Sequence, residues 1–108
     1  MKTKRKDQLT ELITREVSAL LPKHIRSETY KLLFITHLEL NSDSSQVKVW
    51  VSAQENVDLL QNELNFKVRD MQIELNKLLH MKIVPKLVLK ADEKNPDLER
   101  VENLLSKL

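Results

Sequence analysis

Six residues between positions 62 and 80 form the arrangement in this chain that is best suited to binding chemistry: Asn62, Phe66, Arg69, Ile73, Lys77 and His80. At about 100° per residue they fall on one side of a helix, opposite its apolar stripe. Glu63, Asp70 and Glu74 fall beside this set and not within it. Apolar side chains between cations suit nucleic acid, because bases can stack on Phe66 while cations meet phosphates. The alternative is a helix covered on both sides, with Phe66 and Ile73 in a second packing layer.

Residues that would support catalysis or metal binding are not arranged for it. The chain has no cysteine and no glycine, which excludes thiol chemistry and the usual glycine-rich phosphate loops. His24, His37 and His80 lack metal-ligand spacing and are expected to be solvated. The acidic residues after position 96 fit the polar side of a short amphipathic helix better than an acid–base pair. We therefore expect no enzyme activity, no metal and no cofactor.

A long helix must position the binding residues. Its core-facing stripe repeats every three or four residues over about six turns, at Val57, Leu60, Leu64, Val68, Met71, Leu75 and Leu78. A first helix is expected from an Asp7 cap to Pro22, since the residue before proline disfavours the helical region. Residues 23–31 form a polar connection. Asn95 and Pro96 are typical of the cap and first position of a last helix.

Alternating apolar residues predict the sheet on which these helices pack. The first strand, 33–40, would place Phe34, Thr36, Leu38 and Leu40 on one face. A polar turn, 41–45, leads to a second strand with Val47, Val49 and Val51 on one face.

The third strand is expected at 83–90. Trp50 is expected on the open sheet face beside Ile35 and Val88, packed against these strand neighbours, with base stacking as the alternative. The predicted architecture is an α+β domain of order α-β-β-α-β-α, with a three-stranded sheet and helices on one face.

Charge is unevenly distributed along a chain whose net charge is only +2. Residues 1–31 and 66–90 each carry four more basic than acidic side chains, whereas 32–65 and 91–108 are acidic. The two basic blocks could meet in a phosphate-binding patch, although such fluctuations also occur on ordinary charged surfaces. At this length one domain over 1–108 is expected, with a basic, flexible tail at 1–6. No apolar run suggests a membrane segment or a secretory signal, so we expect a cytoplasmic monomer.

Several segments, in their order and spacing, resemble the ribosome-binding factor A family. The resemblance spans about 9–108 and is carried by residues 12–17, 41–43, 47–52, 83–87 and 100–105. It implies a type II KH fold. It also implies binding to small-subunit ribosomal RNA during late maturation of the 30S subunit, without catalysis or cofactor. The family is further linked to processing of the 5′ end of the rRNA precursor and to growth in the cold.

One departure from the family pattern concerns the long helix. The family has a kink with a small residue and a glycine, and the corresponding position here is Lys67-Val68-Arg69. Without that glycine we expect a helix bent less sharply than the family's.

The resulting site prediction combines both lines of reasoning. Phosphate contacts are expected from Lys67, Arg69, Lys77, His80 and Lys82, with Phe66 as the stacking group. Lys2, Lys4, Arg5 and Lys6 would form a second, flexible contact. Two alternative functions stay open: a general single-stranded RNA-binding KH module, and a protein-interaction adaptor that uses the Phe66/Ile73 face.

Overall fold

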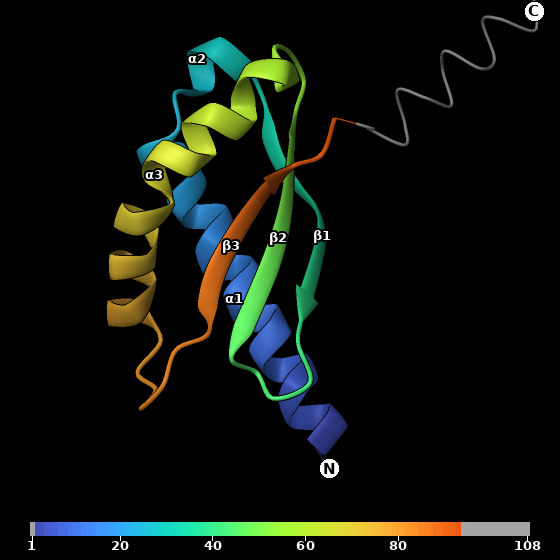
Figure 1. Cartoon of the computed structure of the whole chain (residues 1–108), viewed down its shortest axis with the longest axis vertical. Helices are drawn as coiled ribbons and strands as arrows, with labels where there is room; N and C mark the ends of the chain where they lie inside the picture. The colour runs from blue at the N-terminus through green and yellow to red at the C-terminus, as the bar shows by residue number, and fades with distance from the viewer. Residues whose placement is uncertain (1, 94–108) are drawn as a thin grey trace, which may run out of the picture.

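The computed structural model describes residues 2–93, with side chains from Arg5 onward. Its elements are α1 (Lys2–His24), α2 (Ser27–Tyr30), β1 (Leu33–Leu40), β2 (Gln46–Ala53), α3 (Val57–Leu78) and β3 (Lys86–Ala91). This order confirms the predicted α+β, KH-like architecture as far as the third strand (Figure 1). The last helix, predicted from Asn95, lies outside the described residues.

Both ends of α1 differ from the prediction. The helix begins at Lys2, so residues 2–6 of the predicted flexible tail form its first turns, and Asp7 is not its cap. It also continues past Pro22 to His24. Proline removes one N–H donor from the last turn, while its fixed φ is compatible with a helix. The predicted connection contains the short helix α2, which ends at the buried Tyr30.

The sheet has the strand order β1-β2-β3, with β1 antiparallel and β3 parallel to β2. The pairing of β1 with β2 is irregular at Thr36, which forms a β-bulge. One extra residue exchanges the two faces of a strand, so Ile35, and not Phe34, joins Leu38 and Leu40 on the core side. The predicted common face of Phe34, Thr36, Leu38 and Leu40 is therefore wrong.

One face of the sheet packs against α1 and α3 in a continuous core. Figure 1 shows α1 behind the sheet and α3 along its β3 side. The core includes Val47, Val49 and Val51 from β2 together with Leu64 and Met71 from α3. Leu38, predicted on the apolar face of the first strand, is half-buried, and so are Val57 and Val68 of the predicted core stripe of the long helix. Burial of these aliphatic side chains supplies the main driving force for the fold.

The long helix α3 is continuous from Val57 to Leu78, without a break at the predicted kink position. Its axis nevertheless changes direction near the middle, so its two halves run differently along the sheet (Figure 1). Leu78, predicted in the core stripe, is 43% exposed, and Leu79, four residues after Leu75, is the residue buried at this end of the helix. Asn56 caps the start of α3 in the left-handed region, with φ 58°, which asparagine tolerates better than most residues.

Candidate nucleic-acid interface

The outer side of α3 carries apolar side chains that no described element covers. Phe66 is 80% exposed and Ile73 is 47% exposed. Leu59, which the sequence reasoning missed, is 51% exposed and extends the same side by two turns. The spacing 59, 66 and 73 is a repeat of seven, which could have identified Leu59. We call Leu59, Phe66, Ile73, Arg69 and Lys77 the outer face of α3.

Cations interleave with these apolar groups. Arg69 and Lys77 are exposed on the outer face, whereas Lys67 is half-buried. The Lys67 ammonium nitrogen lies 5.8 Å from the centroid of the Phe66 ring, within the range of a cation–π contact. An aromatic ring beside a cation can stack on a base while the cation meets the adjoining phosphate.

Two of the neighbouring carboxylates on α3 are engaged on the inner side. Glu63 accepts hydrogen bonds from the Tyr30 hydroxyl at 3.0 Å and from the Arg26 N–H at 3.2 Å. Glu74 forms a hydrogen bond with His24 at 3.0 Å. Glu63 and Glu74 therefore tie α3 to α2 and α1. Two other carboxylates of α3, Asp58 in its first turn and Asp70 between Arg69 and Lys77, are exposed beside the positive side chains of the outer face.

The Glu63 contact also changes the chemistry of Tyr30. Burial, the hydrogen bond to Glu63 and the nearby charges of Glu63 and Asp58 raise the pKa of Tyr30 to about 12. The folded state therefore favours the neutral, protonated form of the Tyr30 side chain.

The segment after α3 adds to the basic, apolar surface. His80 and Lys82 are exposed there, together with Met81 (41%) and Ile83 (75%). Ile83 was predicted as the first residue of a strand, but β3 begins three residues later at Lys86. Residues 80–83 thus form a loop at the end of the outer face, with two polar and two apolar side chains exposed.

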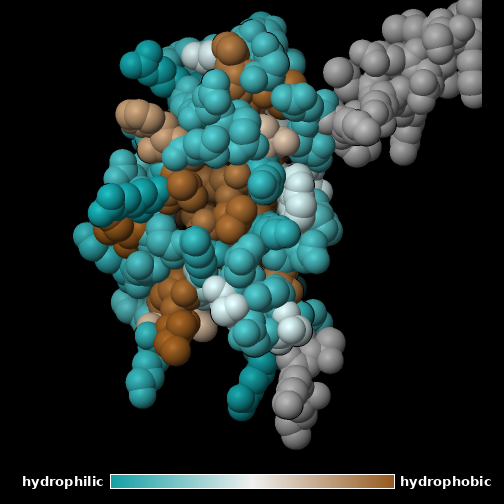
Figure 2. Space-filling view, in the orientation of Figure 1, coloured by the Kyte–Doolittle hydropathy of each residue, from teal (hydrophilic) through white to brown (hydrophobic). Residues whose placement is uncertain are grey.

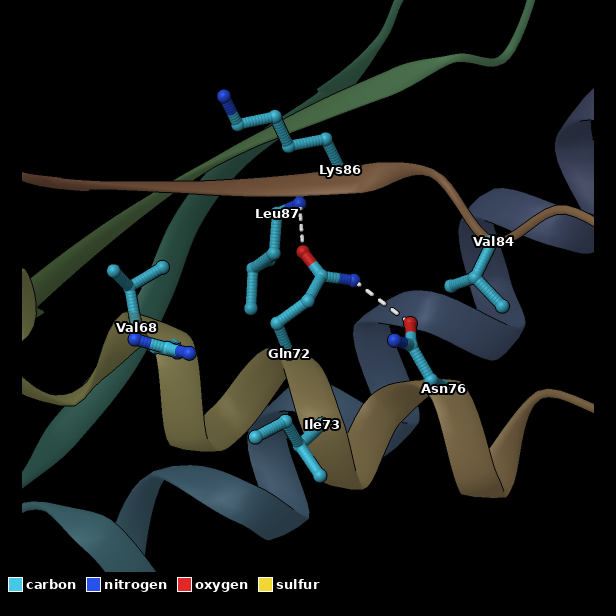
Figure 3. Close-up of a pocket in the computed structure, with 8 residues that line it drawn as sticks. Val68, Gln72, Ile73, Asn76, Val84, Lys86 and Leu87 are labelled. Carbon is cyan, nitrogen blue, oxygen red and sulfur yellow. Dashed lines mark hydrogen bonds between the residues drawn. The ribbon is translucent and has the colours of Figure 1, made fainter.

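A hollow of about 470 Å³ lies between α3 and β3. Figure 2 shows apolar surface gathered in a hollow between these two elements. The residues that line it are Val68, Arg69, Gln72, Ile73, Asn76, Val84, Lys86 and Leu87. Figure 3 shows that the Gln72 side chain points from α3 to β3, while Lys86 extends away from Gln72. Two cations, Arg69 on the helix and Lys86 on the strand, therefore flank an apolar groove.

The N-terminal cations are remote from this groove. Figure 1 shows the start of α1 below the β1–β2 turn, whereas α3 lies along the β3 side of the sheet. Arg5 is exposed and Lys6 is half-buried, and Lys4 belongs to the first turns of the helix. The structure thus brings Phe66, Lys67, Arg69 and Lys77 onto one helix, followed by His80 and Lys82. It does not join them to residues 4–6 in one patch.

The described residues contain no group of three or more His, Asp or Glu side chains that could hold a metal ion. Within the same part of the chain, no helix is long and apolar enough to cross a membrane.

Comparison with known sequences gives a consistent family. The family model described as "Ribosome-binding factor A" matches residues 5–105. A ribosome-binding factor A from Syntrophobacter fumaroxidans is 28% identical over 113 residues, covering 100% of this chain and 97% of the relative. One from Pelobacter propionicus is 24% identical over 109 residues, covering 98% of this chain and 89% of the relative.

Comparison with solved structures agrees on the fold. The crystal structure of ribosome-binding factor A from Thermus thermophilus has a TM-score of 0.71 and 20% identity, covering 84% of this chain and 99% of that one. A homology model of the Thermus thermophilus factor, fitted into a cryo-EM map of its complex with the 30S subunit, has a TM-score of 0.68 and 19% identity, covering 77% and 90% of the two chains. With a family model that spans nearly its whole length, this chain belongs to the ribosome-binding factor A family.

Proposed function

We propose that this protein is a non-catalytic ribosome-assembly factor that binds immature small-subunit ribosomal RNA through the outer face of α3. The observation that carries the proposal is the exposed Phe66 ring between Lys67 and the exposed Arg69 and Lys77. Family membership supports the ribosomal target, and a relative has been fitted into a map of a 30S complex.

In this proposal the side chains have separate roles. Phe66 stacks on an unpaired base, and Lys67, Arg69 and Lys77 contact the phosphates beside it. His80 and Lys82 extend the contact past the end of α3. Lys4, Arg5 and Lys6 form a separate contact from the first turns of α1, at a distance from the groove.

We assign the finer biological role by the same reasoning. The factor acts as a cytoplasmic monomer without cofactor during late 30S maturation, when the 5′ end of the rRNA precursor is processed, and it supports growth in the cold. None of these steps requires the protein to make or break a bond.

Sucrose-gradient sedimentation tests the assignment. Tagged protein expressed in its own cells should sediment with immature small subunits and not with free RNA at the top of the gradient. Deleting the gene should cause precursor rRNA with an unprocessed 5′ end to accumulate, most strongly at low temperature. Absence of the protein from all subunit fractions would contradict the proposal and would favour a KH module that acts on other RNA.

A second candidate function rests on the repeat of seven residues at Leu59, Phe66 and Ile73. This spacing fits the apolar seam that one helix offers another, so the outer face would also suit a partner helix. Salt separates the two candidates. Binding through phosphates weakens steeply as salt rises, whereas an apolar helix interface does not.

A further inference from the structure

The face of the sheet that is turned away from α1 and α3 carries an aromatic pair with lysines around it. Trp50 lies there, half-buried, with its ring centroid 4.9 Å from that of His37 and the two planes tilted by 45°. The prediction that Ile35 lies beside Trp50 is wrong, because the bulge at Thr36 turns Ile35 to the core side. An aromatic pair therefore stands where the sequence suggested an aliphatic contact.

Exposed lysines surround this pair. Lys90 is the register partner of Trp50 on β3, and Lys48 lies two residues before Trp50 on β2. Lys86 and Lys90 flank the half-buried Val88 on the same face. None of the three lysines is in a salt bridge within the described residues.

Two carboxylates share the face but do not neutralise it. Glu39 is exposed and lies opposite Lys48 in the β1–β2 pairing. Asp92 accepts a hydrogen bond of 2.6 Å from the Thr36 hydroxyl. The surroundings of Trp50 therefore stay basic, since its closest charged neighbours along and across the strands are Lys48 and Lys90.

The three helices within residues 2–93 leave this face open, because α1 and α3 join the core on the other side. The open face is also continuous with the groove beside α3. Lys86 lines that groove and extends from it to the open face (Figure 3). The phosphate backbone of a bound strand could therefore run from Arg69 to Lys86 and then to Lys90, around the edge of β3.

We propose that the open face of the sheet around Trp50 is a second binding surface for single-stranded RNA. A base stacks on the Trp50/His37 pair, and Lys48 and Lys90 contact the phosphates on either side of it. Exposed aromatics between cations on a β-sheet are suited to unpaired bases, because every base has a face for stacking. This surface is separate from the outer face of α3 and extends the RNA contact proposed there.

Trp50 is the chain's single tryptophan, so its fluorescence reports on this face alone. We would titrate the full-length protein with a fluorescein-labelled oligouridine of about ten nucleotides, following both RNA anisotropy and Trp50 emission. The proposal expects Trp50 emission to be quenched in parallel with the rise in anisotropy. Binding of the RNA without any change in Trp50 emission would overturn it.

Charge reversal supplies the second readout. The variant K48E/K90E should bind the oligouridine about tenfold more weakly or worse, because two phosphate contacts become repulsive. R15E/K23E is the matched control, since it makes the same change in net charge at exposed positions on α1. Urea unfolding of both variants confirms that they are folded. Equal affinities for the two variants would overturn the proposal.

Further outcomes separate this inference from the proposed function. If R69E/K77E abolishes oligouridine binding while K48E/K90E leaves it intact, the sheet surface is wrong and the outer face of α3 stands. If the oligouridine does not bind at all, the sheet surface is wrong, and co-sedimentation with small subunits alone decides the proposed function. If acrylamide fails to quench Trp50 in the free protein, residues 94–108 or a second copy cover the face, which also overturns the proposal.

Discussion

The side chain of Gln72 on α3 is hydrogen-bonded to the backbone of Leu87 on β3, at the outer edge of the sheet. The Gln72 side-chain oxygen Oε1 accepts a hydrogen bond of 2.6 Å from the Leu87 N–H. The nitrogen Nε2 of the same amide donates to the Pro85 carbonyl at 3.2 Å. One glutamine thus satisfies a donor and an acceptor that an additional strand would otherwise use.

A second glutamine repeats this contact three turns earlier on the helix. Gln61 accepts a hydrogen bond of 2.7 Å from the Ala91 N–H and donates one of 3.3 Å to the Leu89 carbonyl. Unpaired strand edges are templates for aggregation, and proteins protect them. In this fold α3 protects β3 with side-chain amides while it also presents the outer face to solvent.

The first prediction concerns this edge. Gln72→Leu removes both hydrogen bonds to this edge, and also the one that Gln72 Nε2 donates to Asn76 at 3.0 Å, while keeping a similar side-chain volume and helix propensity. We expect the free energy of unfolding to fall by roughly 1 kcal/mol. This is the low end of the cost of leaving a backbone donor and acceptor without partners, because the contact is only half-buried. Amide hydrogen exchange at Leu87 should become faster. Asn62→Leu, at an exposed position of the same helix, is the control, and unchanged exchange at Leu87 would contradict the assigned role.

These glutamine contacts are a part of the fold that could not be predicted from the sequence. Apolar periodicity predicted the long helix, the hairpin and the third strand, because burial of one face imposes a regular period. The bulge at Thr36 was not predictable from that period, since it follows from pairing with β2. Gln61 and Gln72 lie on α3 outside its core stripe. Their partners are backbone groups that have no sequence signature.

The second prediction compares two positions on α3. Leu64 is fully buried, whereas Phe66 is 80% exposed. Leu64→Ala should lower the free energy of unfolding by about 2–5 kcal/mol, through lost burial and a remaining cavity. Phe66→Ala should change it by less than about 0.5 kcal/mol, because the ring contributes little to the core. Chemical denaturation measures both, and a large loss for Phe66→Ala would mean that this ring packs against another part of the chain.

The outer face itself was largely predictable. A helical wheel separates Phe66 and Ile73 from the core stripe whatever the tertiary structure. Two features needed the structure. Lys86 joins Arg69 across the groove only because β3 lies beside α3. The first helix extends to Lys2, so residues 4–6 lie at its start, near the β1–β2 turn and not beside the groove.

The third prediction concerns alkaline pH. The pKa of Tyr30 is raised from 10.0 to about 12 in the folded protein, chiefly by burial and then by its hydrogen bond to Glu63. The folded state therefore favours the protonated phenol. Its stabilisation is fully present below pH 10.0 and is lost as the pH rises towards about 12.

Tyr30→Phe isolates this effect. The difference in unfolding free energy between the parent and this variant should shrink or reverse as the pH rises from about 10 to about 12, because only the parent has the phenol. Lysine titration affects both proteins and cancels in the comparison. Urea unfolding at a series of pH values measures the difference, and a constant difference across this range would show that the Tyr30 pKa is not raised.

The last prediction concerns the outer face of α3. Reversing Arg69 and Lys77 to glutamate should weaken binding to small-subunit RNA by well over about tenfold, because two phosphate contacts become repulsive. Stability should change little, since both side chains are exposed. The parent should also lose affinity steeply with rising salt, through release of counterions, and the variant should show a shallower salt dependence. Fluorescence anisotropy with labelled RNA, repeated at several salt concentrations, measures both quantities.

Two control variants separate geometry from net charge. R15E/K23E makes the same change in charge on α1 and should bind much more tightly than R69E/K77E. E99K/E102K, in the acidic block 91–108, should not weaken binding. If R69E/K77E binds like the parent, or loses affinity only because it unfolds, α3 is not the RNA surface. The contact would then move to Lys4, Arg5 and Lys6 at the start of α1, where the same charge reversal can be tested. Family membership would be unaffected, because it depends on the sequence match over residues 5–105 and not on which surface meets RNA.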